Sequence, residues 1–588
     1  MFACFSKYFL RLYFVAIAAL FAVLMAVGIW RHYSDVPFWD MWDGYLGFYT
    51  RAGQGWGAWW EQHNEHRLIL SRLIFWVDLH CWHGSMVLPY ILNGFFPLLI
   101  AGNFVFVFQR LHGSAGQSSL VPIAVAAVMV VLATSWVQHE NFTWIFESQV
   151  FLAYLLPLLA FTLLAHAQAA GRRRSVWLAW LAGLASAGAM ANGILALPLL
   201  TLQAWALRLR KRYICILLLT SVLIWCFYFY DYHMLGQNLA QKGLVRIIEH
   251  SEVMWIPYAG PLHAVRWLSF VRYLLLFLGG PWYFVLQKIA LWPVMAAGVL
   301  WLILALITAW RVLRPPVQPY PVALLMLIVY IGAAALGVAH GRVVFGVEQA
   351  LSSRYLTPQF MAWTALLLLG VYLWPRATAS RLALGGYAAI VLLLLPAQLQ
   401  GIDVAFGQSA SLRIPALAIQ LGIRDFERIR QISYDGERTF ALVQQARRER
   451  LAVFGEPDMQ LALRYWSGAS FAVQISPMRC DGYVDAVESI PDVSDAVRIC
   501  GWLYDPHGRQ VPSLVLLSGG ARGRGVALGG LWRPDVGQAE HARQASVAGF
   551  CGYLQGSALA AGTPVMLTGW VKQRPVCTLT LDPRQWRK

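Results

Sequence analysis

Residues 119–137 read SLVPIAVAAVMVVLATSWV, a run without a single charge. A helix of this length crosses the roughly 30 Å hydrocarbon core of a membrane. An open strand could not, because lipid offers no partner to unpaired backbone groups. Comparable runs recur through the first 400 residues, and only 13% of the 588 residues are charged, against about 25% in soluble domains. The sequence therefore predicts an α-helical polytopic membrane protein.

Apolar runs of this kind give eleven candidate spans. They are 11–30, 86–108, 119–137, 149–168, 175–191, 193–208, 213–231, 288–310, 320–339, 357–374 and 382–399. With the N-terminus in the cytoplasm, the loops that carry most of the arginines fall on the inner side, as the positive-inside rule requires. All twelve acidic residues of the first 400 then fall on the outer side. This placement suggests that the functional polar residues lie on the outer side. The alternative is that acidic residues are simply rare here and that chance placed several of them outside.

The formal net charge of +17 invites a nucleic-acid interpretation, but its distribution argues against one. Residues 401–588 carry 21 basic and 17 acidic side chains, so most of the excess lies in the first 400 residues. Much of that excess sits in short loops between apolar runs, where it sets the topology of the spans. We therefore expect the lipid bilayer, and no nucleic acid, as a partner.

The predicted domain organisation has three parts. Residues 1–400 form the transmembrane domain, with outer loops at 31–85, 138–148, 232–287 and 340–356. Residues 401–470 are predicted to be an α-rich linker region. Residues 471–588 show short alternating runs separated by Gly and Pro, which predict a β-sandwich on the extracytoplasmic side.

Two segments of the outer loops are expected at the membrane surface. Residues 43–60 alternate apolar and polar groups and hold several aromatics, a pattern typical of a helix lying in the interface. Residues 267–278 are apolar, but Gly279-Gly280-Pro281 should break a helix there. We expect this second segment to be interfacial or re-entrant rather than spanning.

The cysteines of the C-terminal region support an extracytoplasmic location. Cys480, Cys500, Cys551 and Cys577 would pair in an oxidising compartment. Four cysteines allow three connectivities. We expect sequence neighbours to pair, as Cys480–Cys500 and Cys551–Cys577.

The strongest candidate for catalysis is the stretch PFWDMWD at residues 37–43, just outside the first span. Asp40 and Asp43 are three residues apart and would share one face of a helix. Neighbouring aromatics would raise the pKa of one carboxyl, as a general base requires. The alternative is an interfacial aromatic belt whose acids face water.

A second polar stretch, EQHNEHR, occupies residues 61–67. His63 and His66 with Glu65 could bind a divalent metal, but zinc motifs place histidines at i and i+4, whereas these are at i and i+3. The same side chains could hydrogen-bond sugar hydroxyls or a phosphate. They could also form an ordinary polar loop face.

Two further outer loops contribute polar groups. Glu140 and Asn141 precede a span that begins at Gln149, and they could line a cavity shared with the first loop or simply cap a helix. Arg342 and Arg354 lie in the loop between the ninth and tenth spans. The arginine side chain grips phosphate through a bidentate fork, and the alternative is an ion pair with an outer acid.

Five motifs in order resemble those of bacterial GT-C-type membrane glycosyltransferases, in particular the members tied to surface-polysaccharide assembly. The motifs are Phe38-Trp39-Asp40 with Trp42-Asp43, residues 62–67 with Arg72-Leu73, Glu140-Asn141 with Trp144 and Gln149, Ala191-Asn192-Gly193, and Ser353-Arg354-Tyr355. The resemblance covers about residues 1–400, and the β-rich tail lies outside it. It implies a GT-C-like fold.

The resemblance also implies an activity. The enzyme would be inverting, and it would transfer a sugar from a polyprenyl-phosphate donor to a glycan or lipid-linked acceptor at the outer face of the bacterial cytoplasmic membrane. Asp40 would be the base, with Asp43 orienting the acceptor or sharing the role. Arg354, Tyr355 and Arg342 would bind the donor phosphate. The substrate pocket would be lined by His63, Glu65, His66, Arg67, Glu140, Asn141 and Gln149.

Two other function classes stay open on the sequence alone. A polymerase or ligase of surface glycans would need similar outer-loop arginines and acids. A transporter, or a scaffold whose outer β domain binds glycan, would be non-enzymatic. No cofactor is implied by any of these readings, although a divalent metal is compatible with the His63 and His66 stretch.

Overall fold

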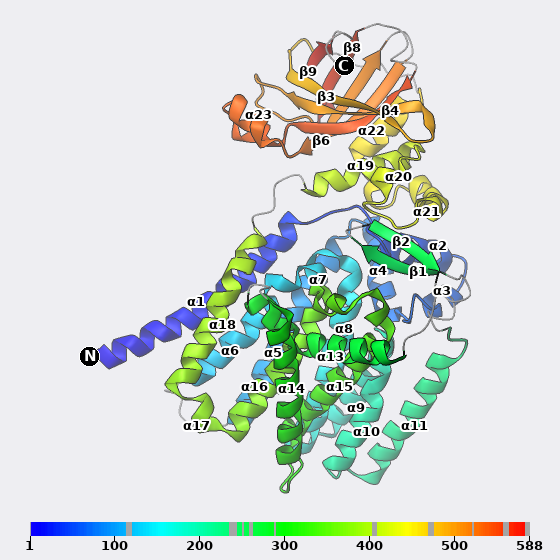
Figure 1. Ribbon diagram of the computed structural model, residues 1–588. Helices are drawn as coiled ribbons and strands as arrows, with labels where there is room; N and C mark the ends of the chain where they lie inside the picture. The colour runs from blue at the N-terminus through cyan, green and yellow to red at the C-terminus, as the bar shows by residue number, and fades with distance from the viewer. Residues whose placement is uncertain are drawn as a thin grey trace. The chain divides into compact units, whose positions relative to one another are not determined.

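The computed structural model describes residues 2–112, 120–233, 244–249, 252–257, 263–286, 290–402, 408–468, 476–519, 523–556 and 564–581 (Figure 1). The chain divides into two compact units. The first, here the helical unit, consists of Met1–Trp30, Trp59–Ser71 and Pro89–Ile402. The second, here the C-terminal unit, consists of Arg31–Ala58, Arg72–Leu88 and Asp403–Lys588. Two segments of the predicted first outer loop thus fold with the C-terminal part of the chain.

Ten helices among the described residues are long and apolar enough to cross a membrane. They contain α1 (Phe2–Arg31), α5 (Val87–His112), α6 (Val121–Thr134), α8 (Ser148–Ala170), α11 (Lys211–Phe229), α13 (His263–Val285), α14 (Leu291–Val312), α15 (Pro319–Arg342), α16 (Leu356–Leu373) and α18 (Arg381–Gln400). The 14-residue α6 counts together with the short helices that continue it to Thr143. Several continue into short helices at one end, including η2 (Trp136–Gln138), α7 (His139–Thr143), η3 (Ile145–Glu147), η5 (Val343–Phe345), η6 (Val347–Leu351) and η7 (Ser353–Tyr355). The multi-pass membrane character predicted from the apolar runs is confirmed.

Two of the eleven predicted spans are shorter than a full span. The predicted spans 175–191 and 193–208 correspond to α9 (Arg173–Ser186) and α10 (Ala196–Ala206), of 14 and 11 residues, joined by η4 (Ala191–Leu195). Neither helix reaches the roughly 20 residues that cross a hydrocarbon core. Arginines lie at the start of α9 and just after the end of α10. The two helices therefore form a hairpin whose two ends lie on the same, basic side of the helical unit.

The predicted helix break at Gly279-Gly280-Pro281 is wrong, because α13 continues through all three residues. A Cβ atom on Gly279 would collide with the carbonyl oxygen of Val294 in α14, and one on Gly298 would collide with that of Leu275 in α13. Small residues let helix backbones approach closely, which stabilises helix packing where water is absent. The glycines therefore serve packing between two helices rather than ending one.

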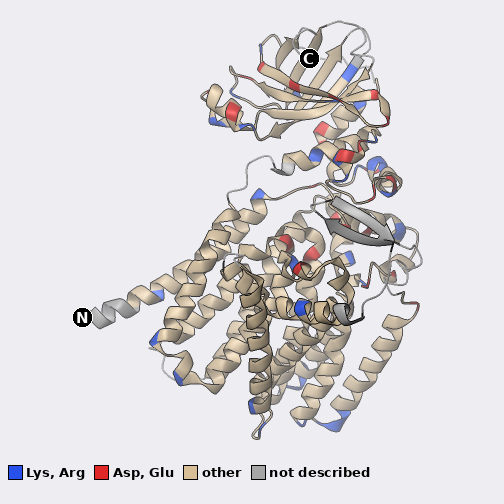
Figure 2. Ribbon diagram, viewed as in Figure 1, with Lys and Arg blue, Asp and Glu red and all other residues tan. Residues whose placement is uncertain are grey.

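Charge is segregated within the helical unit (Figure 2). Basic residues gather at the ends of α11, α14 and α17 (Pro375–Thr378), and a group of acidic residues lies at the opposite end of the helices. The last turn of α18 lies at the acidic end, because the Gln398 side chain accepts from the Trp136 backbone N–H at 2.7 Å and donates to the Phe21 carbonyl at 2.9 Å. Trp136 begins η2, and Glu140 lies in α7, which follows η2 directly.

The C-terminal unit begins with short helices. Those between residues 408 and 466 are α19 (Gln408–Leu421), α20 (Phe426–Ile429), α21 (Gly436–Arg448), η8 (Ala452–Gly455) and α22 (Pro457–Trp466). Asp425 and Asp435 cap α20 and α21, accepting from the backbone N–H groups of Arg428 at 3.3 Å and Arg438 at 3.0 Å. The first-loop segments add η1 (Trp42–Gly47), α2 (Phe48–Ala52) and part of α4 (Ile69–Trp82), and α3 (Gly57–Trp60) follows α2.

The prediction that residues 43–60 lie as a helix in the membrane interface is wrong for residues 45–48, which protein covers. Trp42 donates its indole N–H to the Ile432 carbonyl at 2.9 Å, and its ring packs against Phe454. Tyr45 and Phe48 are fully buried inside the C-terminal unit. An amphipathic pattern shows that one face must be covered, and here protein rather than lipid covers it.

The predicted β-sandwich is instead a single curled sheet. Its order is β3-β4-β7-β6-β5-β8-β9, and every neighbouring pair is antiparallel. The strands are β3 (Asp481–Ile490), β4 (Val493–Tyr504), β5 (Leu514–Gly519), β6 (Gly523–Leu531), β7 (Gly549–Gln555), β8 (Val565–Val571) and β9 (Arg574–Leu581), with α23 (Pro534–Ala539) and η9 (Arg543–Val547) between β6 and β7. Strand alternation reveals one buried face but not whether a second sheet or the curled sheet itself covers it. Another two strands, β1 (Leu244–Glu249) and β2 (Glu252–Pro257), pair separately in the helical unit.

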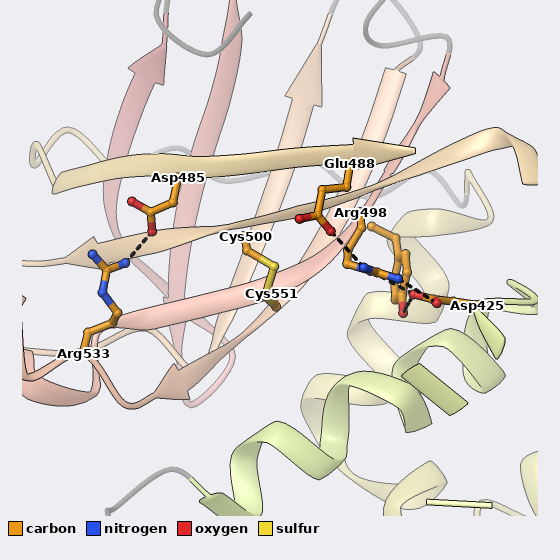
Figure 3. The surroundings of a disulfide bond; sticks show 8 residues. Asp425, Asp485, Glu488, Arg498, Cys500, Arg533 and Cys551 are labelled. Carbon is orange, nitrogen blue, oxygen red and sulfur yellow. Dashed lines mark hydrogen bonds and ion pairs between the residues drawn. A yellow bond between two sulfur atoms is a disulfide. The ribbon is translucent and has the colours of Figure 1, made fainter. Parts of the chain in front are cut away.

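All four predicted cysteines form disulfides, but the predicted pairing of sequence neighbours is wrong. The bonds are Cys480–Cys577 and Cys500–Cys551. Cys500 in β4 lies directly opposite Cys551 in β7 in the strand register, within the surroundings drawn in Figure 3. Cys480 precedes one edge strand and Cys577 belongs to the other, so their bond joins the two edges of the curled sheet. Strand register, which the sequence does not state, therefore decides the pairing.

Candidate functional site

The first part of the candidate site is a tight turn at residues 63–66 of the helical unit. The His63 N–H donates to the His66 carbonyl at 2.8 Å, and the His66 N–H donates back at 2.9 Å. Asn64 adopts a left-handed conformation within the turn, which asparagine tolerates better than most residues. The turn fixes the backbone between two histidines and leaves Glu65 at its tip.

Arg67 fastens this turn to the end of α11. Its guanidinium donates to the carbonyls of Trp60 at 2.6 Å, Tyr228 at 2.9 Å and Tyr230 at 2.7 Å. The same group stacks on the ring of Trp60. Most of its N–H donors are thereby used by backbone carbonyls, so the structure gives Arg67 a structural role in place of the predicted contact with substrate.

Glu65 and His66 connect the turn to two other loops. The Glu65 carboxylate pairs with Arg342 at 2.9 Å. His66 Nδ1 accepts from the Ala191 backbone N–H at 3.3 Å, which places the ring proton on Nε2. Burial lowers the pKa of His66 to about 4, so the ring is neutral at pH 7. A neutral ring already holding a backbone N–H is suited to positioning rather than to proton transfer.

The second part of the site joins the turns before α8 to the start of α16. Asn141 donates from Nδ2 to the Arg354 carbonyl at 3.0 Å and to the Thr357 hydroxyl at 2.8 Å. The Glu140 backbone N–H donates to the Ser353 hydroxyl at 3.0 Å. The structure thus brings together residues more than two hundred positions apart, and all three of the predicted residues Glu140, Asn141 and Arg354 meet here.

Arg354 is the cation at the centre of this part. Its guanidinium lies over the ring of Tyr355, 5.4 Å from the centroid, and has the carboxylates of Glu140 and Glu147 as electrostatic neighbours. Its Nε–H is buried and has no acceptor among the described residues. Leaving a buried donor unsatisfied costs about 1–3 kcal/mol, and more for a charged group. An anion bound beside Arg354 would relieve that cost.

Two contacts link the parts into one site. Tyr273 of α13 has both Arg354 and Arg342 as electrostatic neighbours, and Arg342 is the partner of Glu65. The His63 ring meets Phe146 edge to face, with centroids 5.2 Å apart, directly before Glu147. Gln149 is buried at the start of α8, and its Oε1 has no partner among the described residues. The turn at residues 63–66 and the residues around Arg354 therefore form one connected cluster.

The two predicted catalytic acids belong to the C-terminal unit, where they differ in their surroundings. Asp43 accepts from Arg51 and from Arg438, each at 3.0 Å. The Asp40 carboxylate accepts no hydrogen bond within the described ranges, and it lies near Tyr434, whose pKa is raised by burial and by the Asp40 charge. Of the two acids, Asp40 therefore has the fewer partners within the described ranges, and its convergence with Arg354 stays a prediction.

One interpretation of the turn at residues 63–66 was a site for a divalent metal ion. Within the described part of the chain, no group of three or more His, Cys, Asp or Glu side chains is arranged to hold a metal ion. The His63 and His66 side chains instead contact Phe146 and the Ala191 backbone. The geometry of this turn therefore supports hydrogen bonding and positioning more directly than metal ligation.

Some residues of the cluster were not assigned by the sequence. Glu147 is buried beside Arg354, and Tyr273 lies between the two arginines. The Asn192 amide follows the backbone N–H that His66 accepts, and both its Oδ1 and its Nδ2 are buried without a partner among the described residues. Asn192 belongs to one of the five motifs of the resemblance, which gave it no role of its own, whereas nothing in the sequence marks Tyr273.

Comparison with known proteins leaves the chain unassigned. No family model, no curated protein and no solved structure matches it. The chemistry of the cluster around Arg354 is therefore the basis for a functional assignment.

Proposed function

We propose that the protein is a membrane glycosyltransferase. It transfers a sugar from a polyprenyl-phosphate donor to a glycan or lipid-linked acceptor, on the outer face of the bacterial cytoplasmic membrane. The observation that carries this proposal is the Arg354 guanidinium, whose buried Nε–H has no acceptor among the described residues and which lies at the start of a helix long and apolar enough to cross a membrane.

The position of Arg354 suits a phosphate that is attached to a lipid. The residue lies in η7, at the start of the span that continues as α16, so an anion reaching it from the bilayer need not leave the membrane surface. A phosphate offers several acceptor oxygens to the fork of the guanidinium. The negative charges of Glu140 and Glu147 beside it partly balance the charge of Arg354.

The chemistry that follows is loss of a phosphate leaving group. As the bond from the sugar to the phosphate breaks, negative charge grows on the leaving oxygen, and a fixed guanidinium stabilises that charge. Asn141 and Ser353 hold the backbone on either side of Arg354 in place, so the cation need not rearrange during the reaction. The same residues support the alternative of a glycan polymerase or ligase only if the donor is again a lipid-linked phosphate.

Asp40 is our candidate for the base that takes the proton from the acceptor hydroxyl. Its carboxylate accepts no hydrogen bond within the described ranges, whereas Asp43 is held by Arg51 and Arg438. An inverting reaction needs the base on the face of the sugar opposite the leaving phosphate. The proposal therefore requires Asp40 to reach that face while the donor phosphate is bound at Arg354.

The test compares Asp40→Asn, Arg354→Gln and a control, Asp231→Asn. Asp231 is an exposed acid of the helical unit that contacts His233 and lies outside the proposed machinery. Loss of a general base is expected to slow transfer about 10²–10⁴-fold, and loss of the cation about 10²–10³-fold. The measurement is the sugar composition of surface polysaccharide in cells whose only copy is each variant, with membrane levels checked in parallel.

Each class of protein gives a different result. A glycosyltransferase loses one sugar from the polysaccharide in both site variants and keeps it in the control. A scaffold tolerates both site variants. Should the polysaccharide stay unchanged when the whole chain is deleted, the assignment to glycan synthesis is wrong.

A further inference from the structure

A pocket of about 220 Å³ lies inside the C-terminal unit, apart from the residues used above. It is lined by the segment that follows α1, by α19, by the start of α22, and by the ends of β5 and β6. Its polar residues are Tyr33, Ser34, Asp35, Arg413, Glu456, Asp458 and Ser513. Its apolar wall is made by Ala410, Met459 and Leu528. Four segments that are distant in the sequence therefore build it together.

The pocket has one fixed ion pair. The buried Asp35 carboxylate accepts from Arg413 Nη2 at 3.0 Å and from its Nε at 3.3 Å. The Asp35 carbonyl also accepts from the Val453 backbone N–H at 3.2 Å, which ties the segment after α1 to η8. This pair holds the Arg413 guanidinium in one orientation at the pocket.

The pocket also holds polar groups whose hydrogen-bonding capacity the fold uses only in part. Glu456 lies 3.8 Å from Arg413 Nη2, beyond hydrogen-bond distance. The Glu456 carboxyl shares a hydrogen bond with Asp35. Within the described part of the chain, the Asp458 carboxylate accepts no hydrogen bond, and Arg413 donates from Nε and Nη2 but not from Nη1. The site therefore offers two N–H donors next to two carboxylates.

These donors and acceptors favour some classes of ligand over others. A metal ion would lie against the guanidinium, and a cation such as Ca²⁺ needs six to eight oxygen ligands. An anion would meet three carboxyl groups, those of Asp35, Glu456 and Asp458, against the single guanidinium of Arg413. An ammonium group could satisfy the carboxylates but could not accept from Arg413 Nη1. A hydroxyl group both donates and accepts, so neighbouring hydroxyls satisfy the donors and the acceptors at once.

We propose that this pocket binds a neutral sugar residue, with vicinal hydroxyls between Arg413 and the carboxylates of Glu456 and Asp458 and with the ring against Met459 and Leu528. Burial and the charge of Asp35 raise the pKa of Glu456, which reduces the negative charge that a neutral ligand would meet. The site is distinct from the transfer reaction and does not depend on it. It would let the C-terminal unit hold a glycan chain.

The test measures binding of single sugars to the full chain in lipid nanodiscs by saturation-transfer difference NMR. The neutral probes are the methyl glycosides of glucose, galactose and mannose, and the charged probes are glucosamine and glucuronate. The variants are Glu456→Ala and Asp458→Ala, each lacking one carboxylate. The matched control is Glu437→Ala, because Glu437 is an exposed acid in the first turn of α21 that pairs with Arg424 outside the pocket.

The proposal predicts a saturable signal for at least one neutral glycoside, weakened at least 10-fold in both variants and unchanged in the control. Thermal unfolding of each variant checks that the unit stays folded, and having two variants guards against a folding defect in one. Tighter binding of glucosamine would identify an ammonium site, and tighter binding of glucuronate an anion site. Either of these results, the absence of any signal, or equal binding in the variants would overturn the proposal.

Discussion

The buried ion pair between Arg498 and Asp425 gives the sharpest prediction about stability. Arg498 of β4 donates to Asp425 from Nε at 3.1 Å and from Nη2 at 2.9 Å, and both side chains are buried (Figure 3). Asp425 also accepts from the Tyr553 hydroxyl at 3.0 Å and caps α20. The pair therefore fastens the helices of the C-terminal unit to its sheet.

The magnitude of Asp425→Ala follows from these contacts. Removing one partner of a buried pair costs about 3–5 kcal/mol, because the remaining charge stays buried. Arg498 keeps contacts with Glu427 at 3.0 Å and Glu488 at 2.8 Å, both exposed, so we expect the lower end of that range. For a folding unit of this size, a loss of about 3 kcal/mol lowers the Tm by roughly 6–12 °C.

The assay is thermal unfolding of the full chain in detergent, followed by protease susceptibility of the β sheet. Glu488→Ala is the matched control, because it removes an exposed partner of the same arginine and should cost about 0–1 kcal/mol. If Asp425→Ala unfolds at the same temperature as Glu488→Ala, the pair does not join the helices to the sheet as argued.

Three further predictions concern single features. Replacing Cys480 and Cys577 by Ser should destabilise the sheet by about 2–5 kcal/mol, because their bond constrains a 97-residue separation, and urea unfolding under non-reducing conditions measures this; an unchanged midpoint would contradict it. Gly298→Leu should lower the level of folded protein in the membrane, because its side chain collides with the Leu275 carbonyl, and detergent size-exclusion profiles equal to wild type would refute the close packing. Since the pKa of His66 is lowered to about 4 in the folded state from an ordinary 6.5, its contribution to stability is full above pH 6.5 and falls as the pH drops toward 4. Thermal unfolding across that range should show a smaller loss for His66→Gln than for wild type, and parallel curves would contradict the prediction.

The helices could be predicted well from the sequence because lipid imposes a strict rule on apolar runs. The run at 119–137 appears as α6 and its continuation, and most other spans lie within a few residues of their predictions. The rule says nothing about glycines inside such a run. A glycine can end a helix or let two helices pack closely, and only the neighbours decide between these outcomes: Val294 of α14 for Gly279 and Gln359 of α16 for Gly280.

The sequence could indicate which residues of the candidate site to consider, but only some of the contacts that they make. Asn141 and Arg354 stand out because polar groups are rare next to membrane spans, and the structure brings them into contact. Arg67 shows the limit of this reasoning, because an arginine that binds carbonyls of its own chain looks the same in sequence as one that binds phosphate. The placement of Trp42 in the C-terminal unit depends on contacts with residues almost 400 positions away, which local patterns do not contain.

The central claim is that Arg354 holds the phosphate of a lipid-linked donor. The most direct measurement is the binding of polyprenyl phosphate to wild type, Arg354→Lys and Arg354→Gln, by native mass spectrometry of the protein released from nanodiscs. The account predicts clear binding to wild type, weaker binding to the lysine variant, which keeps the charge but not the fork, and almost none to the glutamine variant. Equal retention of the lipid phosphate by all three proteins would contradict it.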